Sequence, residues 1–485
     1  MADSTKRYIA ADLGLSQGKV LLASVTGGVL TAETVHTFDI PTVRMDGQDY
    51  WDIFAAYSEL LKGLTVIGSR KLSIESIGID AWGPGIVCLG RDGRIFGLPC
   101  MCGDVLSEAY QAKFFKRMSR RELYEAAGVN VLDSHAALQL FALRRGKSVA
   151  LDEAKSLLFI PEAIAYLLTG KRFTEYASLS AAGLVDRRSG KISRDVLEAC
   201  KVRPKRFPSV VQQGARPGKL TEEVAEATGL GRVPVVTVSG HDLASAAAAA
   251  PSAGEGSAFL YTGAVSVIGV ETVTPVVSDQ TFEMNFSNEA GAAGVNLLVK
   301  RIAGTDLLGR CLAAWRAAGL AYSPEDVALM AREGAPTAAQ LDPEDPALRS
   351  VAAAPAAISR YCSLRSMTPP ADDAALVRLV YSSLAEKIGD TFLKLQSVTP
   401  FRLKALHIVG NGVPIPGSQP SEDGSSASLF VGGASDPVFC QMVADECAVT
   451  VTAGPADVAA LGNVLVQSGL PRTALSAPVS YTPSL

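Results

Sequence analysis

The segment that most constrains this chain lies near its N-terminus, where two short apolar runs flank a polar, glycine-containing turn. Tyr8–Ala11 and Val20–Val25 have the length and composition of strands, and short apolar runs bounded by turn residues predict a β-hairpin. The turn between them carries Asp12, Gly14, Ser16, Gln17, Gly18 and Lys19. Backbone N–H groups, a hydroxyl, an amide and an ammonium bind phosphate oxygens, whereas a carboxylate suits a phosphate-bound Mg²⁺ or its water. The segment therefore predicts a phosphate-binding hairpin.

Two other interpretations of this segment compete with that one. Any β-hairpin can carry Gly, Ser and Asp in its turn without meeting a phosphate. A P-loop is the second alternative, but Gly14–Val20 has one residue too few between its glycines and places Val20 where Ser or Thr should bind Mg²⁺. The segment also runs into a β-rich stretch rather than a helix, which excludes the P-loop interpretation.

The composition is that of a folded globular protein with no charge signature for a polyanionic partner. The 485 residues are 48% hydrophobic and 19% charged, with a net charge of −4, so neither nucleic acid nor a membrane surface is expected as a partner. The N-terminus lacks the apolar core of a signal peptide, and no run reaches the roughly 18 apolar residues of a membrane span. Eight scattered cysteines without CxxC pairs and four separated histidines predict reduced thiols, no zinc site and a cytoplasmic location.

Strand-like and helix-like segments alternate along the chain, which favours an α/β fold. Ser73–Asp80 has the alternation of a strand, and a helical region is expected over about Arg120–Arg145. A second hairpin is predicted over Ala258–Val270, about 250 residues after the first. Two hairpins of similar layout indicate a duplicated architecture, with a boundary within 243–257 that gives domains 1–243 and 244–485. The Pro/Gly/Ser-rich stretch 410–428 is predicted to be a surface insertion.

Six segments, taken in order, carry a resemblance that covers nearly the whole chain. They are the Asp12 hairpin, Asp49-Tyr-Trp-Asp52, Ile77-Gly-Ile-Asp-Ala-Trp-Gly83, Leu168-Thr-Gly-Lys171 with Thr174–Ser178, Ser239-Gly-His-Asp-Leu-Ala-Ser-Ala246 and Tyr261-Thr-Gly-Ala264. In this order they resemble the FGGY family of carbohydrate kinases in the actin–hexokinase superfamily, and its rhamnulokinase branch most of all. The resemblance implies two actin/hexokinase-like (ribonuclease H-like) α/β domains with a cleft between them.

The resemblance also implies a mechanism in which a carboxylate takes the proton of a sugar hydroxyl while hairpin donors and Mg²⁺ hold the phosphates of ATP. Asp242 is the candidate catalytic base, and Asp12 would order Mg²⁺ through water. Ser16, Gln17 and Lys19 of the first hairpin and Gly263 and Ala264 of the second are candidate ATP-binding residues. Trp82, Gly83, Asp104, His241 and Asp242 are candidate sugar-binding residues.

Three of these residues have a purely structural alternative. Asp242 precedes Leu-Ala-Ser-Ala and would serve well as a helix N-cap. His241 could be a satisfied structural histidine rather than a ligand of a sugar hydroxyl. Trp82 could pack in the core instead of forming a wall of the sugar pocket.

The chain departs from the family pattern mainly on the nucleotide side. Ala264 stands where the second hairpin usually has a hydroxyl, and Gly309 stands where rhamnulokinases have a glutamine, after Asn288-Glu-Ala-Gly291. The adenine-binding glycine motif occurs in two damaged forms, Gly410-Asn-Gly412 and Gly432-Gly433 with Asp436. The second form is favoured because a nucleotide loop has to open a helix to offer its N–H donors.

On the sugar side two charged groups of the rhamnulokinase pattern are missing. The acid after Trp-Gly is replaced in Trp82-Gly-Pro-Gly85, and the Arg before Asp104 is absent from Cys102-Gly-Asp104. Sites that hydrogen-bond a hydroxyl discriminate strongly, so these losses predict a sugar other than rhamnulose itself.

The function expected is ATP- and Mg²⁺-dependent phosphorylation of a ketose or polyol by a monomer or homodimer. A sugar- or nucleotide-binding regulatory protein on the same fold is the alternative that Ala264, Gly309 and the split glycine motif keep open. A third function, that of an ATPase-type chaperone or an actin-like filament protein, would not explain the presence of His241-Asp242 or Trp82-Gly83. Sugar-stimulated ADP release separates the first two functions.

Overall fold

The computed structural model describes residues 5–83, 85–101, 105–130, 135–250, 256–349, 353–416, 430–475 and 477–484. The chain forms two compact units. Unit 1 comprises Met1–Ala249, Thr272–Leu298 and Ala459–Leu475, and unit 2 comprises Ala250–Glu271, Val299–Val458 and Ser476–Leu485. Two later segments belong to unit 1, so the two units differ from the predicted domains 1–243 and 244–485. The domain boundaries stay a prediction.

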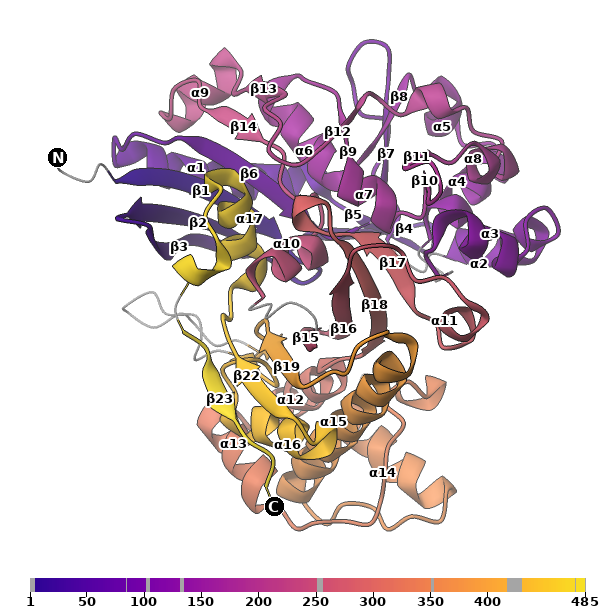
Figure 1. Cartoon of the computed structure of the whole chain (residues 1–485), viewed down its shortest axis with the longest axis vertical. Coiled ribbons are helices and arrows are strands. Elements are labelled where there is room, and N and C mark those ends of the chain that lie inside the picture. Colours follow the sequence, from indigo (N-terminus) through magenta and orange to yellow (C-terminus); the bar gives the residue numbers. More distant parts are fainter. Residues whose placement is uncertain are drawn as a thin grey trace. The chain divides into compact units, whose positions relative to one another are not determined.

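Unit 1 is built on a six-stranded sheet in the order β13-β14-β6-β1-β2-β3 (Figure 1). Its strands are β1 (Lys6–Leu13), β2 (Gln17–Thr26), β3 (Val29–Asp39), β6 (Ser76–Ala81), β13 (Gly218–Lys219) and β14 (Pro234–Val236). β1 pairs antiparallel with β2 and parallel with β6, so the predicted N-terminal hairpin is confirmed as a structure. Every residue of β6 is buried, as expected of a central parallel strand covered on both faces.

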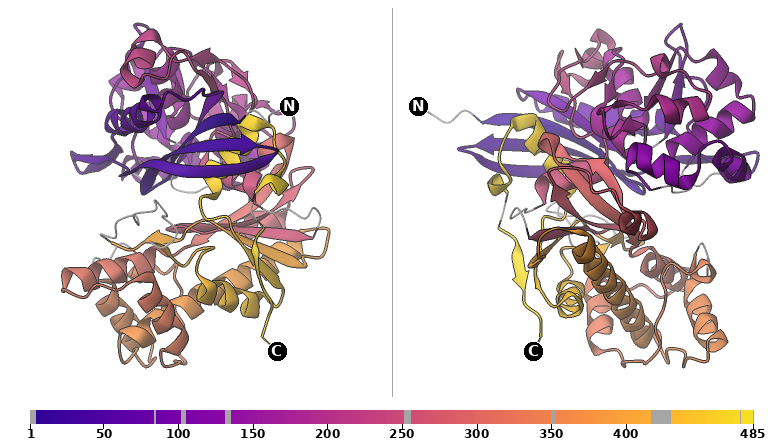
Figure 2. Two further views of the ribbon diagram at one scale, coloured as in Figure 1. Left: turned by 90° about the vertical axis from the view of Figure 1, so that its left-hand side faces the viewer. Right: turned by 45° about the vertical axis from the view of Figure 1, so that its right-hand side comes forward.

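Helices from distant parts of the sequence pack on this sheet. α1 (Ile53–Ser69) begins after Asp52, whose carboxylate accepts a 3.0 Å hydrogen bond from Ala55 N and caps the helix. α6 (Ile160–Thr169) and α9 (Glu222–Thr228) also contribute to the core between helices and sheet. α17 (Val458–Ser468), from near the C-terminus, lies against β1 and β6 (Figures 1 and 2).

A second core of unit 1 gathers around α4 (Ala136–Arg145) and β7 (Ile86–Leu89), which pairs with β8 (Ser156–Phe159). The helical region expected over about Arg120–Arg145 contains two helices, α3 (Arg120–Ala127) and α4, because α3 ends at Gly128, whose φ of 73° leaves the helical range. The remaining elements of unit 1 are β4 (Thr42–Met45), β5 (Gln48–Trp51), α2 (Val105–Phe115), α5 (Val149–Glu153), β9 (Thr174–Glu175), α7 (Tyr176–Ala181), β10 (Val185–Asp186), β11 (Lys191–Ile192), α8 (Arg194–Ala199), β12 (Val210–Val211), α10 (Asp242–Ala249), α11 (Asp279–Glu283) and β17 (Ser287–Ala290).

Unit 2 is also an α/β layer structure, with sheet order β18-β16-β15-β19-β22-β23. Its strands are β15 (Ser257–Tyr261), β16 (Val265–Thr272), most of β18 (Asn296–Ala303), β19 (Ala405–Val409), β22 (Thr450–Ala453) and β23 (Val479–Tyr481). Its helices are α12 (Asp306–Ala317), α13 (Pro324–Glu333), α14 (Ala354–Leu364), α15 (Asp373–Val398) and α16 (Pro437–Cys447), with α15 packed along α13 and α16. β15 and β16 form the predicted second hairpin, and β15 runs parallel to β19. The layout of hairpin plus parallel strands thus occurs in both units.

The stretch predicted as a surface insertion is described only at its start. β20 (Val413–Pro414) pairs antiparallel with β21 (Phe430–Val431), so the chain leaves and re-enters unit 2 at one place. Residues 417–428 lie outside the described residues. Among the helices of the described ranges, none combines the length and apolar character needed to cross a membrane.

Candidate active site

Three acidic residues meet in unit 1 where the central strands of its sheet end. Asp12 and Asp80 are direct partners at the ends of the parallel strands β1 and β6. The segment before α10 reaches the same place, because Ala81 N donates to Gly240 O at 3.3 Å and Ala81 forms a β-bridge with His241. α10 then begins with Asp242. The topology therefore brings together acids that lie 230 residues apart in the sequence.

Asp80 is the buried member of this group and has an unusual charge state. Burial, followed by the charges of Asp12 and Asp242, raises the pKa of Asp80 well above its ordinary range despite the hydrogen bond from Asn463. Asn463 Nδ2 donates to Asp80 Oδ2 at 2.5 Å, whereas Asp80 Oδ1 is buried and has no hydrogen-bond partner among the described residues. The raised pKa favours the neutral form of Asp80, which limits the negative charge of the site.

Asn463 belongs to a buried polar network that holds α17 on the sheet. Gln467 Nε2 donates to Asn463 Oδ1 at 2.7 Å and to Ile9 O at 2.9 Å, and Ser76 Oγ donates to Gln467 Oε1 at 2.6 Å. Gly78 of β6 permits this approach, since a Cβ there would lie 2.2 Å from Asn463 Oδ1. The network anchors the end of β6 that carries Asp80.

Asp242 is more accessible than its neighbours. Its side chain is 19% exposed, against 5% for His241, and its Oδ1 accepts a 2.8 Å hydrogen bond from Leu243 N. That bond comes from the next residue, whereas an N-cap accepts from the second or third residue of the helix, and Asp242 is itself the first residue of α10. The Leu243 bond uses Oδ1 of Asp242, so Oδ2 can accept a proton or a hydrogen bond from a ligand.

His241 stands between two carboxylates. Its Nδ1 lies 3.5 Å from Asp242 Oδ1, and its Nε2 lies 3.4 Å from Oε2 of the fully buried Glu289. Burial opposes the charged imidazolium, but the hydrogen bond to Asp242 and the charges of Asp242 and Glu289 outweigh it and raise the pKa of His241 to about 9. The ring is therefore cationic at neutral pH, and Gly83 lies beside it, with 3.9 Å between a Cβ at that position and His241 Cβ.

The first hairpin holds its candidate residues at the same edge of the sheet. Lys19 is the cross-strand partner of Asp12 and is buried, whereas Ser16 is exposed in the turn and Gln17 is half-buried. Gly14 N donates to Gln17 O at 3.1 Å and closes the turn. Gly18 must lack a side chain, because a Cβ there would lie 2.4 Å from the Phe38 ring. Asp12 and Lys19 are thus brought together, with the turn backbone next to them.

Trp82 lies in the core of unit 1. Its side chain is 1% exposed and its ring centroid is 4.7 Å from that of Trp51. This environment favours the packing interpretation, and contact of Trp82 with a sugar stays a prediction. Asp104 lies outside the described residues.

In unit 2 the second hairpin offers mainly backbone groups. The buried Thr262 donates its hydroxyl to Val409 O at 3.1 Å, and Thr305 donates both N and Oγ1 to Gly263 O. Gly304 packs on this turn so closely that a Cβ would lie 2.2 Å from Gly263 O. The Thr262 hydroxyl thus ties the hairpin to β19 and the Thr305 hydroxyl holds the turn, whereas Ala264 itself has no hydroxyl.

The two damaged glycine motifs lie against each other. Ala434 N donates to Gly410 O at 2.8 Å, and a Cβ on Gly433 would lie 2.3 Å from the carbonyl carbon of Asn411. A Cβ on Gly412 would lie 2.0 Å from Val431 O. The sequence alternatives are therefore two halves of one loop before α16, and the intervening stretch interrupts the sequence without separating the loop.

Asp436 is fully engaged inside unit 2. Its Oδ1 accepts from Val438 N and Phe439 N at 3.1 and 3.0 Å, and its Oδ2 accepts from Gly432 N at 3.0 Å and Tyr381 Oη at 2.6 Å. Burial and then the charge of Asp436 raise the pKa of Tyr381 well above its ordinary value. Asp436 thus caps α16 and fixes Gly432, and a direct contact with ATP stays a prediction.

Comparison with known proteins places this geometry in a family. Residues 7–249 match the model of the N-terminal domain of the FGGY family of carbohydrate kinases. The chain is 34% identical to a rhamnulokinase of Bacteroides thetaiotaomicron over 463 residues, covering 96% of this chain and 90% of that protein. The chain belongs to the FGGY family of carbohydrate kinases. A rhamnulokinase of Klebsiella pneumoniae (strain 342) is 30% identical over 96% of this chain and 89% of its own length.

Solved FGGY-type kinases have the same fold at low sequence identity. A ligand-bound xylulose kinase from Lactobacillus acidophilus superposes with a TM-score of 0.74 at 14% identity, covering 99% of this chain and 94% of that one. Glycerol kinase of Plasmodium falciparum with ADP gives a TM-score of 0.73 at 12% identity, covering 99% and 94%. The expected actin/hexokinase-like α/β fold is confirmed, and the FGGY chain is a carbohydrate kinase with rhamnulokinases among its relatives.

The acids of this FGGY chain suit a phosphate-bound Mg²⁺ rather than a metal cage. Within the described ranges no group of three or more His, Cys, Asp or Glu residues could hold a metal ion directly. Mg²⁺ commonly keeps several waters and needs only one or two carboxylates together with substrate phosphates. Asp12, half-buried beside the turn of the first hairpin, has the chemistry for such water-mediated binding.

Sequence reasoning missed Asp80, Glu289 and Asn463. Asp80 and Glu289 both lie in segments that resemble the family, yet neither had a spacing that pointed to a role. The acid at the end of the predicted strand Ser73–Asp80 was the one signal for Asp80. Asn463 had no signal, because its partner lies 383 residues earlier.

Proposed function

We propose that this chain transfers the γ-phosphoryl group of ATP to a hydroxyl of a small ketose or polyol, with Asp242 as general base. The observation that carries this proposal is the convergence of Asp12, Asp80 and Asp242, among which Asp242 combines partial exposure with a cationic neighbour. A base must reach the hydroxyl proton that it removes. Asp80 is unsuited because it is fully buried and its raised pKa favours the protonated form, and Asp12 is paired in register with Lys19.

The proposed step conserves charge and atoms. The Asp242 carboxylate takes the proton of the attacking hydroxyl while the hydroxyl oxygen bonds to the γ-phosphorus and the bond to the ADP oxygen breaks. The imidazolium of His241 orients Asp242 through Nδ1 while its Nε2 faces Glu289, so donation to a sugar hydroxyl would require one of these two contacts to open. Glu289 keeps His241 charged.

The phosphates are proposed to lie on the two hairpins. Lys19 and the turn donors of Ser16 and Gln17 would hold one set of phosphate oxygens, and the backbone of Gly263 and Ala264 the other. Mg²⁺, when bound through Asp12, would neutralise charge on the phosphates. Gly432 and Gly433, at the start of α16, are the proposed adenine contacts.

The proposed acceptor is a ketose such as a rhamnulose-, ribulose- or xylulose-like sugar, or a polyol. The rhamnulokinase relatives favour a ketose. The neutral Trp82-Gly83-Pro84-Gly85 segment lacks the acid of the rhamnulokinase pattern, which favours a different arrangement of hydroxyls. Cytoplasmic location and a monomeric or homodimeric state remain part of this proposal.

A second candidate function is a sugar- or nucleotide-binding regulator that no longer transfers phosphate. It is favoured by Ala264, which offers no hydroxyl, and by Asp436, whose four hydrogen bonds all go to the protein. A lost hydrogen bond costs about 0.5–1.5 kcal/mol, which weakens ATP binding without abolishing it. The kinase is therefore the function that we propose first.

A coupled ADP-release assay over ketoses, aldoses and polyols tests the two functions. The kinase predicts turnover stimulated by one class of sugar and lost in Asp242→Asn. Calorimetric binding of a sugar without stimulated ADP release from any member of the panel would refute the kinase and support the regulator.

A further inference from the structure

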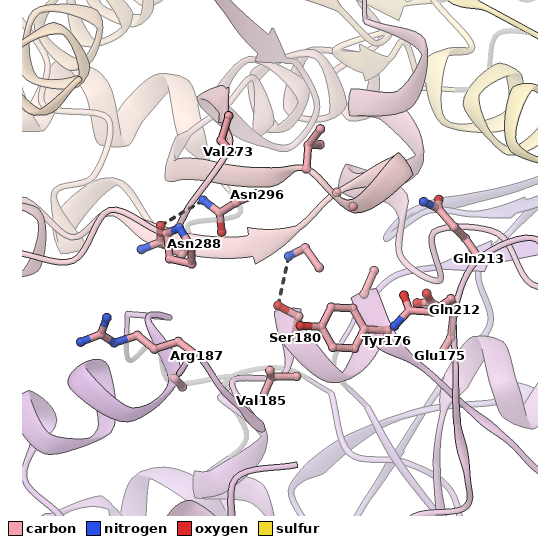
Figure 3. Close-up of a pocket in the computed structure, with 17 residues that line it drawn as sticks. Glu175, Tyr176, Ser180, Val185, Arg187, Gln212, Gln213, Val273, Asn288 and Asn296 are labelled. Carbon is pink, nitrogen blue, oxygen red and sulfur yellow. Dashed lines mark hydrogen bonds between the residues drawn. The ribbon is translucent and has the colours of Figure 1, made fainter. Parts of the chain in front are cut away.

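A separate cavity lies within unit 1 behind the segment that leads to Asp242. It has a volume of about 210 Å³ and is lined by Tyr176, Ser180, Arg187, Gln212, Gln213 and Asn296 among other residues (Figure 3). None of the residues assigned above to sugar, phosphate or Mg²⁺ lines it. The volume is below the roughly 300–1,000 Å³ of pockets for drug-sized ligands, so it suits a molecule smaller than a nucleotide.

The lining of this cavity is rich in hydrogen-bonding groups and carries a positive charge. Arg187 is held by a 2.6 Å hydrogen bond from its Nε to Glu125 O, which leaves the guanidinium at the cavity wall. Glu175 is the acidic residue of the lining. Burial raises its pKa to about 8, so its carboxyl group is mainly neutral at pH 7. Amides, hydroxyls and one aromatic ring around a single guanidinium match a small molecule with several hydroxyls and one anionic group.

Two walls of the cavity are fixed by internal hydrogen bonds. Ala290 N donates to Ser180 Oγ at 3.0 Å, and Asn296 Nδ2 donates to Asn288 Oδ1 at 3.1 Å (Figure 3). These bonds tie α7 to β17 and β17 to the residues after it. A preformed wall lowers the ordering cost of binding a ligand.

Three walls of the cavity also support the segment 239–242. Ser239 Oγ donates to Gln213 Oε1 at 3.3 Å. Gly240 packs on the cavity residue Glu175, since a Cβ at Gly240 would lie 2.4 Å from Glu175 Oε2. On the third wall, Asn288 and Ala290 flank Glu289, the partner of His241. A ligand in the cavity would touch the residues that position His241 and Asp242.

We propose that this cavity is a second ligand site for a small hydroxylated anion, a sugar phosphate or a sugar acid, and that its occupation changes the catalytic rate through the 239–242 segment. The binding part stands independently, whereas the effect on rate rests on the proposed function of Asp242. With such a ligand, the concentration of a sugar phosphate or sugar acid would regulate the catalytic rate.

Calorimetry tests the site with fructose 1-phosphate, glucuronate, inorganic phosphate and fructose as probes. The protein is the full chain carrying Asp242→Asn, so that no turnover disturbs the measurement. Arg187→Ala removes the guanidinium, and Gln212→Trp obstructs the cavity from an exposed position without touching the Arg187 hydrogen bond. Arg188→Ala is the matched control, because Arg188 is the exposed neighbour that does not line the cavity.

The proposal predicts one-to-one binding of fructose 1-phosphate or glucuronate that weakens at least tenfold in Arg187→Ala and in Gln212→Trp but not in Arg188→Ala. The probe that binds with the higher affinity shows whether the site prefers a phosphate or a carboxylate as the anionic group. Absence of binding by both probes, equal affinity of Arg187→Ala and Arg188→Ala, or equally tight binding of fructose or inorganic phosphate would overturn the assignment.

Kinetics on the protein with Asp242 intact tests the coupling separately. Saturating probe should change kcat for sugar-dependent ADP release at least twofold, and Arg187→Ala should abolish that change. An unchanged kcat at saturation would overturn the coupling. Cavity binding without any ADP release would instead refute the proposed kinase while the site stands.

Discussion

Replacing Glu289 by glutamine removes the buried negative charge that lies 3.4 Å from His241 Nε2 and keeps the size of the side chain. The pKa of His241 is about 9 only because Asp242 and Glu289 together outweigh the burial of the ring. An opposite charge within about 4–6 Å of an ionisable group shifts its pKa by about 1–3 units. The pKa of His241 should therefore fall by about 1–2 units in Glu289→Gln.

Histidine ring NMR over pH 5–10 measures this shift directly, with the His241 signal assigned by its loss in His241→Gln. Glu283→Gln is the matched control, because Glu283 is exposed on α11. The alkaline limb of the kcat profile should move down by the same 1–2 units, since the neutral ring no longer holds a charged contact with Asp242. A His241 pKa that is equal in Glu289→Gln and Glu283→Gln would refute the reasoning.

Three further predictions concern pH, helix capping and the nucleotide side. Because folding raises the pKa of Glu175 from 4.5 to about 8, the folded state holds a proton that the unfolded chain releases. The free energy of unfolding should thus fall as pH rises between these values, by up to about 1.4 kcal/mol per pH unit. Urea titrations of Glu175→Gln should give a smaller dependence of this free energy on pH. A dependence equal to that of the unsubstituted protein would argue against the raised pKa. Asp436→Ala should lower the free energy of unfolding by about 2–4 kcal/mol in urea titrations, because it removes a helix cap and leaves buried donors without acceptors, and a loss below 1 kcal/mol would contradict that role. Ala264→Thr should lower KM for ATP by about three- to tenfold in the ADP-release assay with kcat little changed, whereas an unchanged KM would place phosphate away from this turn.

Local patterns predicted the parts of the fold that local interactions determine. The first hairpin follows from two apolar runs around a turn, and α16 follows from Asp436-Pro437 as cap and first residue. The helical region expected over about Arg120–Arg145 is divided into two helices because Gly128 adopts a left-handed conformation that the apolar pattern does not reveal. Element type was thus predicted better than the points where elements break.

The site depends on contacts that no local pattern contains. Burial and the charges of Asp12 and Asp242 raise the pKa of Asp80. Its hydrogen-bond partner Asn463 lies 383 residues away. Glu289 acquires a role only because β17 brings it to His241. The two glycine motifs looked like competing alternatives in the sequence, and their contact through Ala434 and Gly410 required the folded chain.

The central claim is that Asp242, and not the neighbouring Asp80, is the base. It is tested by sugar-stimulated ADP release from Asp242→Asn and Asp80→Asn, with sugar affinity measured by calorimetry on both. Loss of a general base lowers kcat by about 10²–10⁴-fold, so Asp242→Asn should show that loss with sugar binding retained. Asp80→Asn should stay within about tenfold of the unsubstituted protein, because asparagine mimics the protonated carboxyl that the raised pKa of Asp80 favours. A kcat of Asp242→Asn equal to that of Asp80→Asn would contradict the assignment.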